Sequence, residues 1–469
     1  MLKRSQRVSL FPALLLCLLL MLMTACSSTP THSGAQEVST PVGSQSTPTS
    51  ATATNGPQGT TGGSSGMPQT ATSCPAANTA RAAVMRPLAL GSHQNLVYIY
   101  NDVPPNTSTS SGVLRRYDTA TGQKVDIATS GIRIDQAQVS SDGQWVLFLS
   151  IPDPRGDSQH SAMLQLVRMD GQRLQTLYCF PNVTYSGQGH VTRLPISLQW
   201  SVDQKSILIS VNTNNATSQI FVLDVASGSI HQLFLDQNDS LYAYSVVTWL
   251  DDTHFYIIKQ GSSAPTPPAT VFLMDASTAT VGNPGLVNIL TTDTRMSNFS
   301  LDSSPDGRQL YSSYCLLAAG PFSTTIMAGP ATGGARTTFF QGSPQDCVQV
   351  LRVISSSKLL LLAQVSTVAG NAFTNTVWTM NTTPGATTNV LTLLSTSPFD
   401  QTRYDMNETT QFTWSNISRD SNSYALQAVN PAANTQSILI GSLSGGNAQV
   451  IATTSSGMST VSLAGWTTM

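Results

Sequence analysis

A tight turn that returns at regular intervals is the feature that most limits what this chain can fold into. Its clearest copy is Ser140-Ser141-Asp142-Gly143, which lies between the β-rich runs Gln136 to Val139 and Gln144 to Leu149. Asp-Gly between two such runs is a strong signal for a β-hairpin. Related turns centre on residues 93, 142, 203, 252, 306, 356 and 420, at spacings of 49, 61, 49, 54, 50 and 64 residues. The sequence therefore contains seven repeats of one β-rich unit.

Each unit contains a second hairpin after the first. Examples are Leu166 to Gly171 and Phe221 to Gly228, and no amphipathic helical period is sustained after residue 88. Four short antiparallel strands, repeated about every 50 residues, are typical of propeller blades, which gain stability by packing on one another. We therefore predict an all-β fold, a seven-bladed β-propeller of four-stranded antiparallel blades. An open sandwich or two separate β domains is the alternative.

The two ends of the repeat region complement each other. Val461 to Trp466 matches the leading strand Ile196 to Trp200, whereas the first unit, around Leu96 to Tyr100, has no leading strand of its own. An unpaired strand would leave an exposed sheet edge. We expect residues 459–467 to complete the first blade and close a propeller domain that spans residues 74–469.

The Ser-x-Asp-Gly turn resembles the repeat of TolB-type, WD-repeat-like propellers of the bacterial envelope. The resemblance covers about residues 88 to 469, and it is carried by turns such as Ser140 to Gly143 and Ser304 to Gly307. The Trp-Asp dipeptide of eukaryotic WD repeats is missing. The resemblance implies a propeller outside the cytoplasm and does not name a ligand.

The first 25 residues have the pattern of an export signal. Lys3, Arg4 and Arg7 precede a mostly apolar run from Val8 to Met23, which at about 16 residues is short for a membrane-spanning helix. Met23-Thr24-Ala25-Cys26 resembles the lipobox of bacterial lipoproteins, which implies cleavage before Cys26 and lipidation of that residue. The protein would then be exported and lipid-anchored to the outer face of a bacterial membrane, at the cell surface or in the periplasm. An ordinary signal peptide or a retained signal anchor stays open.

The segment after Cys26 is predicted to be a disordered tether. Glu37 is its only charged residue between Ser27 and Ser73, and such a stretch buries too little apolar area to offset the entropy of ordering. Charge is scarce in the whole chain as well, at 10% of residues, with 22 Lys and Arg against 24 Asp and Glu. That balance excludes a polybasic nucleic-acid-binding protein.

Four cysteines remain in the predicted domain, and they allow three pairings. Cys315 and Cys347 fall in consecutive units at strand ends that face the same side of a propeller. A bridge between them is therefore favoured, and it leaves Cys74 to pair with Cys179. Four free thiols stay open as the alternative, although exported proteins meet oxidising conditions.

Signatures of chemistry are scarce. The sequence contains neither H-E-x-x-H nor C-x-x-C, so we expect no metal site and no cofactor. We interpret His231 and His254 as ordinary strand residues. The sequence therefore predicts a non-catalytic protein, which we expect to be a monomer.

Long connections gather on one face of the predicted propeller, opposite the tight turns. Exposed loops on a rigid scaffold often bind partners, although loops also tolerate insertions without any function. The candidate binding residues on this face are Arg155, His160, Tyr185, His190, Arg193, Tyr242, Tyr244, Arg403 and Tyr404. We expect this face to bind a partner protein or an envelope polymer. The alternatives are a hydrolase or lyase that acts on an envelope or environmental polymer, and a sensory or docking subunit.

Overall fold

The computed structural model describes the strands and tight turns of the repeat region. Contacts divide the chain into two units, Met1–Ser64 and Ser65–Met469, and every described residue belongs to the second. The described residues are 74–75, 88–102, 111–151, 162–180, 196–212, 217–236, 242–261, 269–291, 296–316, 324–341, 346–366, 373–381, 390–396, 416–430, 434–454 and 459–468. The predicted signal peptide, Cys26 and the tether to residue 73 lie outside this set.

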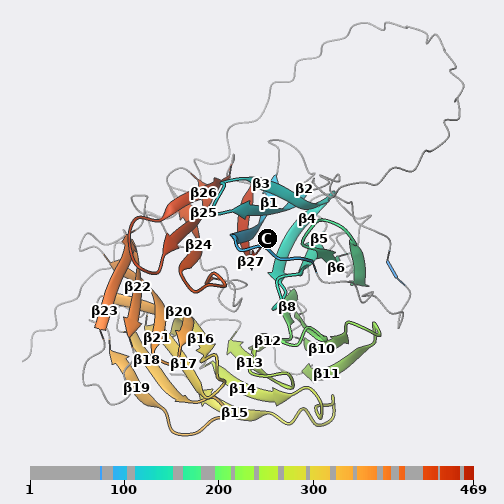
Figure 1. Cartoon of the computed structure of the whole chain (residues 1–469). Helices are drawn as coiled ribbons and strands as arrows, with labels where there is room; N and C mark the ends of the chain where they lie inside the picture. The colour runs from blue at the N-terminus through green and yellow to red at the C-terminus, as the bar shows by residue number, and fades with distance from the viewer. Residues whose placement is uncertain are drawn as a thin grey trace, which may run out of the picture. The chain divides into compact units, whose positions relative to one another are not determined.

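The described residues form seven antiparallel sheets arranged around a central axis, one per predicted unit (Figure 1). From the axis outward, blade one contains β27 (Thr460–Thr468), β1 (Gln94–Asp102), β2 (Ser111–Asp118) and β3 (Lys124–Ser130). Blade two contains β4 (Arg133–Val139), β5 (Trp145–Ile151), β6 (Met163–Arg168) and β7 (Gln175–Cys179). Blade three contains β8 (Ile196–Trp200), β9 (Ser206–Asn212), β10 (Ser218–Asp224) and β11 (Ile230–Asp236). Blade four contains β12 (Tyr242–Trp249), β13 (His254–Gly261), β14 (Thr270–Asp275) and β15 (Val287–Thr291).

The remaining sheets follow the same order. Blade five contains β16 (Met296–Ser303), β17 (Gln309–Leu316), β18 (Thr324–Pro330) and β19 (Thr337–Gln341). Blade six contains β20 (Asp346–Ser355), β21 (Lys358–Ser366), β22 (Phe373–Asn381) and β23 (Val390–Thr396). Blade seven has three described strands, β24 (Ser423–Asn430), β25 (Thr435–Ser442) and β26 (Gln449–Thr453), and its predicted leading strand around Trp414 lies outside the described residues. The predicted seven-bladed β-propeller is confirmed.

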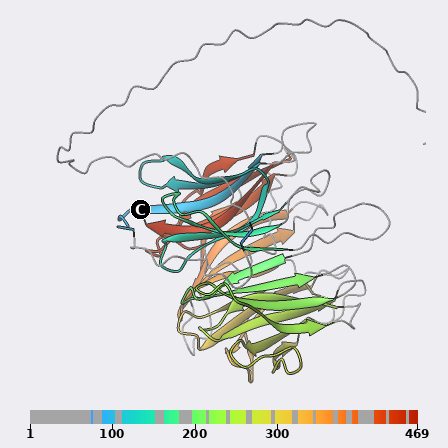
Figure 2. The same cartoon turned by 90° about the vertical axis from the view of Figure 1, so that its right-hand side faces the viewer.

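The last strand closes the ring. β27 pairs antiparallel with β1, in a register that runs from Gln94 opposite Thr468 to Asn101 opposite Thr460. Figure 2 shows the red strands of blade seven and β27 beside the blue and teal strands of blade one. The strand that the sequence predicts over residues 459–467 is β27, and it supplies the inner strand that the first unit lacks.

The repeated turn is held by its own serine and aspartate. Ser140 Oγ donates to Asp142 Oδ1 at 2.5 Å and accepts the backbone N–H of Trp145 at 2.9 Å. Such local bonds satisfy turn backbone groups that would otherwise need water. The same serine–aspartate bond recurs in blades three, five and seven, at 2.8, 2.5 and 2.6 Å. Gly143 has a φ of 76°, and Gln204 has a φ of 64° at the equivalent position of blade three, so the turn forms with or without glycine.

The apolar core is divided among the seams between blades. Each of seven buried clusters joins two neighbouring blades; for example, Leu149 and Leu164 of blade two pack with Leu198 and Trp200 of blade three. A single blade has two apolar faces and can bury them only against its neighbours. The seven clusters together therefore connect the blades into a closed ring.

Neutral polar side chains also bridge the seams. Gln138 of β4 donates from Nε2 to Leu198 O at 3.0 Å, and its Oε1 accepts the N–H of Trp200 at 2.9 Å. Asn101 makes the same paired bonds to the backbone of Ile134 in blade two, at 2.8 and 2.9 Å. These side chains satisfy the backbone of the neighbouring inner strand, as a buried strand edge requires. The side-chain amides of Gln138 and Asn101 thus join neighbouring blades without ion pairs, which fits the low charge content of the chain.

Cys74 and Cys179 form a disulfide, the pairing that the sequence leaves once Cys315 is assigned to Cys347. It ties the segment before blade one to β7, the outermost strand of blade two. Cys315 lies in β17 and Cys347 in β20, on adjacent blades. Their side chains lie outside the described set, so the Cys315–Cys347 bridge stays a prediction.

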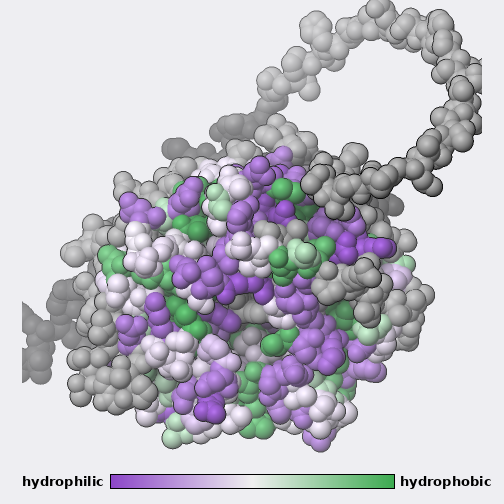
Figure 3. Space-filling model, in the orientation of Figure 1, coloured by the Kyte–Doolittle hydropathy of each residue, from purple (hydrophilic) through white to green (hydrophobic). Residues whose placement is uncertain are grey.

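The described surface is polar without being strongly charged. Figure 3 shows hydrophilic and intermediate residues over most of the visible described face, with hydrophobic residues in separate patches. The exposed large hydrophobic residues are spread over several blades: Val125, Val202, Val281, Val287, Leu393 and Val450. Within the described part of the chain, no helix has the length and apolar character needed to cross a membrane.

Candidate functional site

Most of the binding face expected from the sequence cannot be placed. Seven of its residues lie outside the described part of the chain: Arg155, His160, Tyr185, His190, Arg193, Arg403 and Tyr404. Tyr242 lies at the start of β12, where its backbone pairs with Gly261, but its side chain is also outside the described set. The long-loop face therefore stays a prediction.

Tyr244 corrects one part of that prediction. The sequence interpretation placed it in an exposed connection, but β12 already begins at Tyr242. The Tyr244 side chain is 7% exposed, and its ring lies 4.7 Å from that of Phe234, centroid to centroid. Its backbone N–H donates to Ser218 Oγ of blade three at 3.0 Å. Tyr244 is therefore a core residue of the seam between blades three and four.

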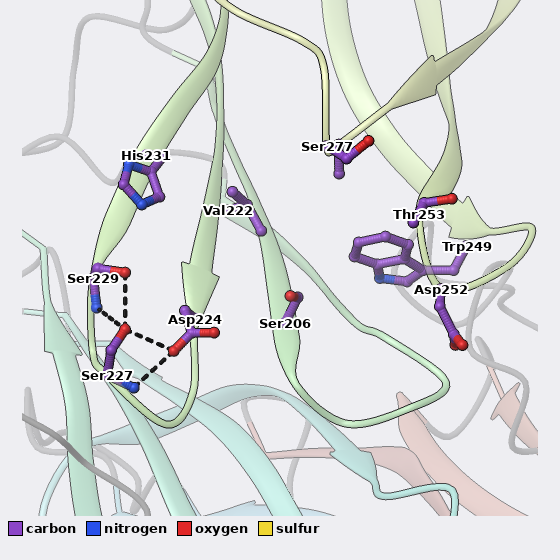
Figure 4. A pocket seen from close by; sticks show the side chains of 11 residues that line it. Ser206, Val222, Asp224, Ser227, Ser229, His231, Trp249, Asp252, Thr253 and Ser277 are labelled. Atoms are coloured by element: carbon purple, nitrogen blue, oxygen red, sulfur yellow. Dashed lines mark hydrogen bonds between the residues drawn. The ribbon is translucent and has the colours of Figure 1, made fainter.

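The same seam opens into a cleft at its other end, where the tight turns lie. The cleft has a volume of about 430 Å³ and is lined from both blades (Figure 4). Blade three contributes Ser206, Val222, Asp224, Ser227, Ser229 and His231, and blade four contributes Trp249, Asp252, Thr253, Ala276 and Ser277. The volume lies within the range of roughly 300–1,000 Å³ that is typical of ligand clefts.

Asp224 ends β10 and is held by the turn that follows. Its Oδ1 accepts hydrogen bonds from the hydroxyl of Ser227 at 2.6 Å and from the N–H of Ser227 at 2.7 Å. The Ser227 hydroxyl, followed by its N–H, lowers the pKa of Asp224 below the ordinary value, and the nearby His231 acts in the same direction. Asp224 is therefore an ionised acceptor at neutral pH, fixed in position before any ligand arrives.

The opposite wall is built in the same way. Asp275 ends β14, and its Oδ1 accepts the hydroxyl of Ser277 at 2.6 Å, which lowers the pKa of Asp275. The indole Nε1 of Trp249 donates to Gln199 O at 3.2 Å, and its ring packs 5.5 Å from that of Phe255. These contacts fix the indole, which extends from blade four toward Val222 and Ser206 (Figure 4).

The cleft combines carboxylates, hydroxyls and an apolar surface. Such a set suits a ligand that donates hydrogen bonds and carries an apolar portion. In the described ranges, no group of three or more His, Cys, Asp or Glu side chains is arranged to hold a metal ion. The side chains that line the cleft offer fixed hydrogen-bond acceptors, such as Asp224.

Sequence reasoning missed this cleft. We interpreted His231 as an ordinary strand residue; it does lie in β11, but it also lines the cleft. Asp224, Trp249 and Asp252 stood in repeat motifs that every unit shares in some form. No local signal marks this cleft, because it is formed by residues from two neighbouring blades.

Comparison with known proteins finds similar solved structures, but no matching family model or curated protein. TolB from Acinetobacter baumannii is 14% identical, with 65% of this chain aligned to 65% of that chain at a TM-score of 0.38. This chain thus covers slightly less than two thirds of that TolB chain.

Two other solved structures are similar over a larger share of their length. An oligogalacturonate lyase from Vibrio parahaemolyticus is 10% identical over 77% of this chain and 86% of its own, with a TM-score of 0.43. The β-propeller domain of the Trilobed protease from Pyrococcus furiosus is 8% identical over 78% of this chain and 98% of its own, with a TM-score of 0.46. The seven sheets and the β27–β1 pairing, more than any of these likenesses, identify the chain as a seven-bladed β-propeller.

Proposed function

We propose that this protein is a non-catalytic binding platform, exported from the cytoplasm and held on a membrane by a lipid on Cys26. The propeller presents a partner protein or an envelope polymer with a rigid surface close to the membrane. The N-terminal sequence supports export, through Lys3, Arg4, Arg7 and the apolar run that ends before Cys26.

The disulfide between Cys74 and Cys179 supports the proposed location. Disulfides persist in oxidising compartments and are rare in the cytosol. The bond also joins the end of the tether segment to blade two. The lipid on Cys26 would therefore be linked to a fixed point on the propeller, since residues 27–73 lie between them.

The observation that carries the proposal is the state of Asp224 in the cleft. Its pKa is lowered by hydrogen bonds from its own turn, whereas a group that transfers protons at neutral pH needs a pKa near 7. An oriented carboxylate that is ionised at neutral pH, beside the fixed indole of Trp249, is suited to holding a ligand.

A photo-crosslinking amino acid at Ser277, on the rim of the cleft, tests the proposal in intact cells. We expect the crosslinker at position 277 to capture a discrete partner. The same crosslinker in place of Val125, an exposed position on β3, should not capture that partner. Identical products from both positions would contradict the binding platform. So would turnover of an envelope polymer by the purified protein.

The anchor has its own test. Replacement of Cys26 by Ser should move the protein from the membrane fraction to the soluble extracytoplasmic fraction, because one hydroxyl cannot carry the acyl chains. A Cys17→Ser variant is the matched control, since Cys17 lies within the predicted signal peptide. Membrane retention of the Cys26→Ser protein would contradict lipid anchoring.

A further inference from the structure

The turns of blades three and four carry an excess of negative charge. Between Ser201 and Ser206, Asp224 and Ser229, Leu250 and His254, and Asp275 and Ala279, there are five carboxylates and one lysine, a net charge of −4 with His neutral. Counted one residue further along each turn, which adds no charge in blades three and four, the equivalent turns of blades one and two hold three carboxylates, Asp118, Asp142 and Asp170, against Lys124, Arg168 and Arg173. The whole chain has a net charge of only −2. The acidic excess is therefore local to the seam that contains the cleft.

Two of these carboxylates are available to a ligand. Lys205 pairs with Asp203 at 3.0 Å, and His254 pairs with Asp251 at 2.9 Å. Among the described residues, neither Asp224 nor Asp252 has a lysine or arginine nitrogen within 4.0 Å. Asp224 belongs to the wall formed by blade three and Asp252 to the wall formed by blade four. The cleft thus has, on each side, a carboxylate without a direct lysine or arginine partner in the described part of the chain, with His231 near Asp224 and Lys205 near Asp252.

Between these charges lies an apolar surface. Val222 and Ala276 line the cleft together with the indole of Trp249 (Figure 4). Lysine and arginine side chains carry a long apolar stem and a cationic head, and an indole attracts the head as well. Hydroxyls on both walls, including Ser206 of blade three and Thr253 of blade four, offer acceptors for N–H donors.

We infer that the cleft binds the lysine or arginine side chains of a basic segment in a partner protein. This inference rests on the proposed function, and it names the chemistry of the partner. Charge complementarity selects it: an acidic polymer would bring like charges to Asp224 and Asp252, which costs free energy. An uncharged polymer would leave the local charge excess without a role.

Fluorescence anisotropy with a labelled ten-residue peptide of alternating Lys and Gly tests the inference on the mature protein. We expect this peptide to bind and a Glu-Gly peptide of equal length to fail. Affinity should fall as salt rises, because added ions screen exposed charges. Equal binding of the two peptides would overturn the inference, as would a Kd that is insensitive to salt.

Variants locate the site. Asp224→Asn and Asp252→Asn should each raise the Kd of the Lys-Gly peptide by about two- to fivefold, the range for a partly exposed charge pair. Asp306→Asn, on a blade-five turn outside the cleft, is the matched control for loss of one charge. An equal loss with Asp306→Asn would show attraction to overall charge and overturn the site. Asp252 accepts no turn hydrogen bond of the kind that holds Asp224, so its variant separates binding from folding.

Two further arms separate this inference from its rivals and from the proposed function. Spermidine is added as a competitor at the same concentration of positive charge as the Lys-Gly peptide. If it displaces the peptide, the cleft is assigned to small polyamines, and the inference of a protein partner is overturned. The crosslinker at position 277 is also placed in the Asp224→Asn and Asp252→Asn proteins. If it still captures the partner in both, the inference of a cationic ligand is overturned, but the proposed binding platform is not. Peptide binding without any capture in cells would contradict the platform alone.

Discussion

Two regions of the same ring differ in the contacts that their turns make. Where blades seven, one and two meet, Arg419 donates to Trp466 O at 2.8 Å, to Ser140 O at 2.7 Å and to Ser141 O. Thr467 Oγ1 adds a bond to Gly143 O at 2.7 Å. Where blades three and four meet, residues of the turns line the cleft. One turn motif therefore produces both a locked seam and an open one.

The residue between serine and aspartate in the turn differs between the two regions. In blade seven it is Arg419, whose side chain reaches two other blades. In blade two it is Ser141, whose hydroxyl donates to Val202 O of blade three at 2.6 Å. In blade three it is Val202, which is 52% exposed and has no polar atom in its side chain. A hydrogen-bonding side chain at this position lets the turn reach a neighbouring blade, as Arg419 and Ser141 show.

The largest effect should come from deletion of residues 460–469, which removes β27 from the locked region. Loss of β27 exposes the edge of β1 and removes the buried side chains of Val461, Leu463 and Trp466. We expect aggregation or loss of a cooperative thermal transition, measured by size-exclusion chromatography and circular dichroism. Removal of Met469 alone is the control. A monomer with an unchanged melting temperature would contradict closure by β27.

Arg419→Ala should have the next largest effect. It removes three hydrogen bonds from one charged donor, and we expect the free energy of unfolding in urea to fall by about 1–3 kcal/mol. Arg308→Ala is the matched control, because Arg308 is 83% exposed and lies 4.0 Å from Asp306. Its loss should change stability by less than about 0.5 kcal/mol. Equal effects of the two substitutions would remove the contrast between the seams.

Val202→Arg transfers the blade-seven residue to the turn beside the open seam. The new guanidinium lies near the carboxylates of blades three and four, so we expect a rise in stability of about 0.5 kcal/mol. The substitution should also raise the Kd of the Lys-Gly peptide by about fivefold, since the added guanidinium neutralises part of the negative charge of these turns. Val202→Gln, which adds length without charge, is the control. Unchanged peptide binding in the Val202→Arg protein would show that the turn does not control the cleft.

The smallest effect concerns pH. The pKa of Asp224 is lowered in the folded state, so its contribution to stability is present above the unfolded pKa and is lost as pH falls through the folded value, below about pH 4. Ser227→Ala removes the main cause of that shift. We expect it to lower the free energy of unfolding by less than about 1 kcal/mol at pH 7, and the difference from wild type should shrink toward pH 3.

Ser444→Ala provides the control for this titration. The Ser444 hydroxyl bonds to Ser442 Oγ at 2.7 Å and not to a carboxylate. Its substitution should therefore shift stability by the same amount at every pH. A pH-independent deficit in the Ser227→Ala protein would contradict the link between Ser227 and Asp224.

Strand order and closure followed from local patterns. Ser140-Ser141-Asp142-Gly143 marks a hairpin because serine and aspartate satisfy the turn backbone within five residues. The likeness of Val461 to Trp466 to the leading strands indicated where the last strand belongs. Tyr244 was misplaced because the sequence does not mark where a connection ends and a β-strand begins, and β12 starts two residues before it.

The sequence by itself determined the repeat, the number of blades and the turn chemistry, because each of these depends on residues that are neighbours in the chain; the export signal stays a prediction. Only the tertiary structure showed the cleft between blades three and four. The cleft joins Asp224 and Trp249, residues from two blades whose separation depends on the packing of whole sheets. The same holds for Arg419, whose partners Ser140 and Trp466 are brought within reach only when the ring closes.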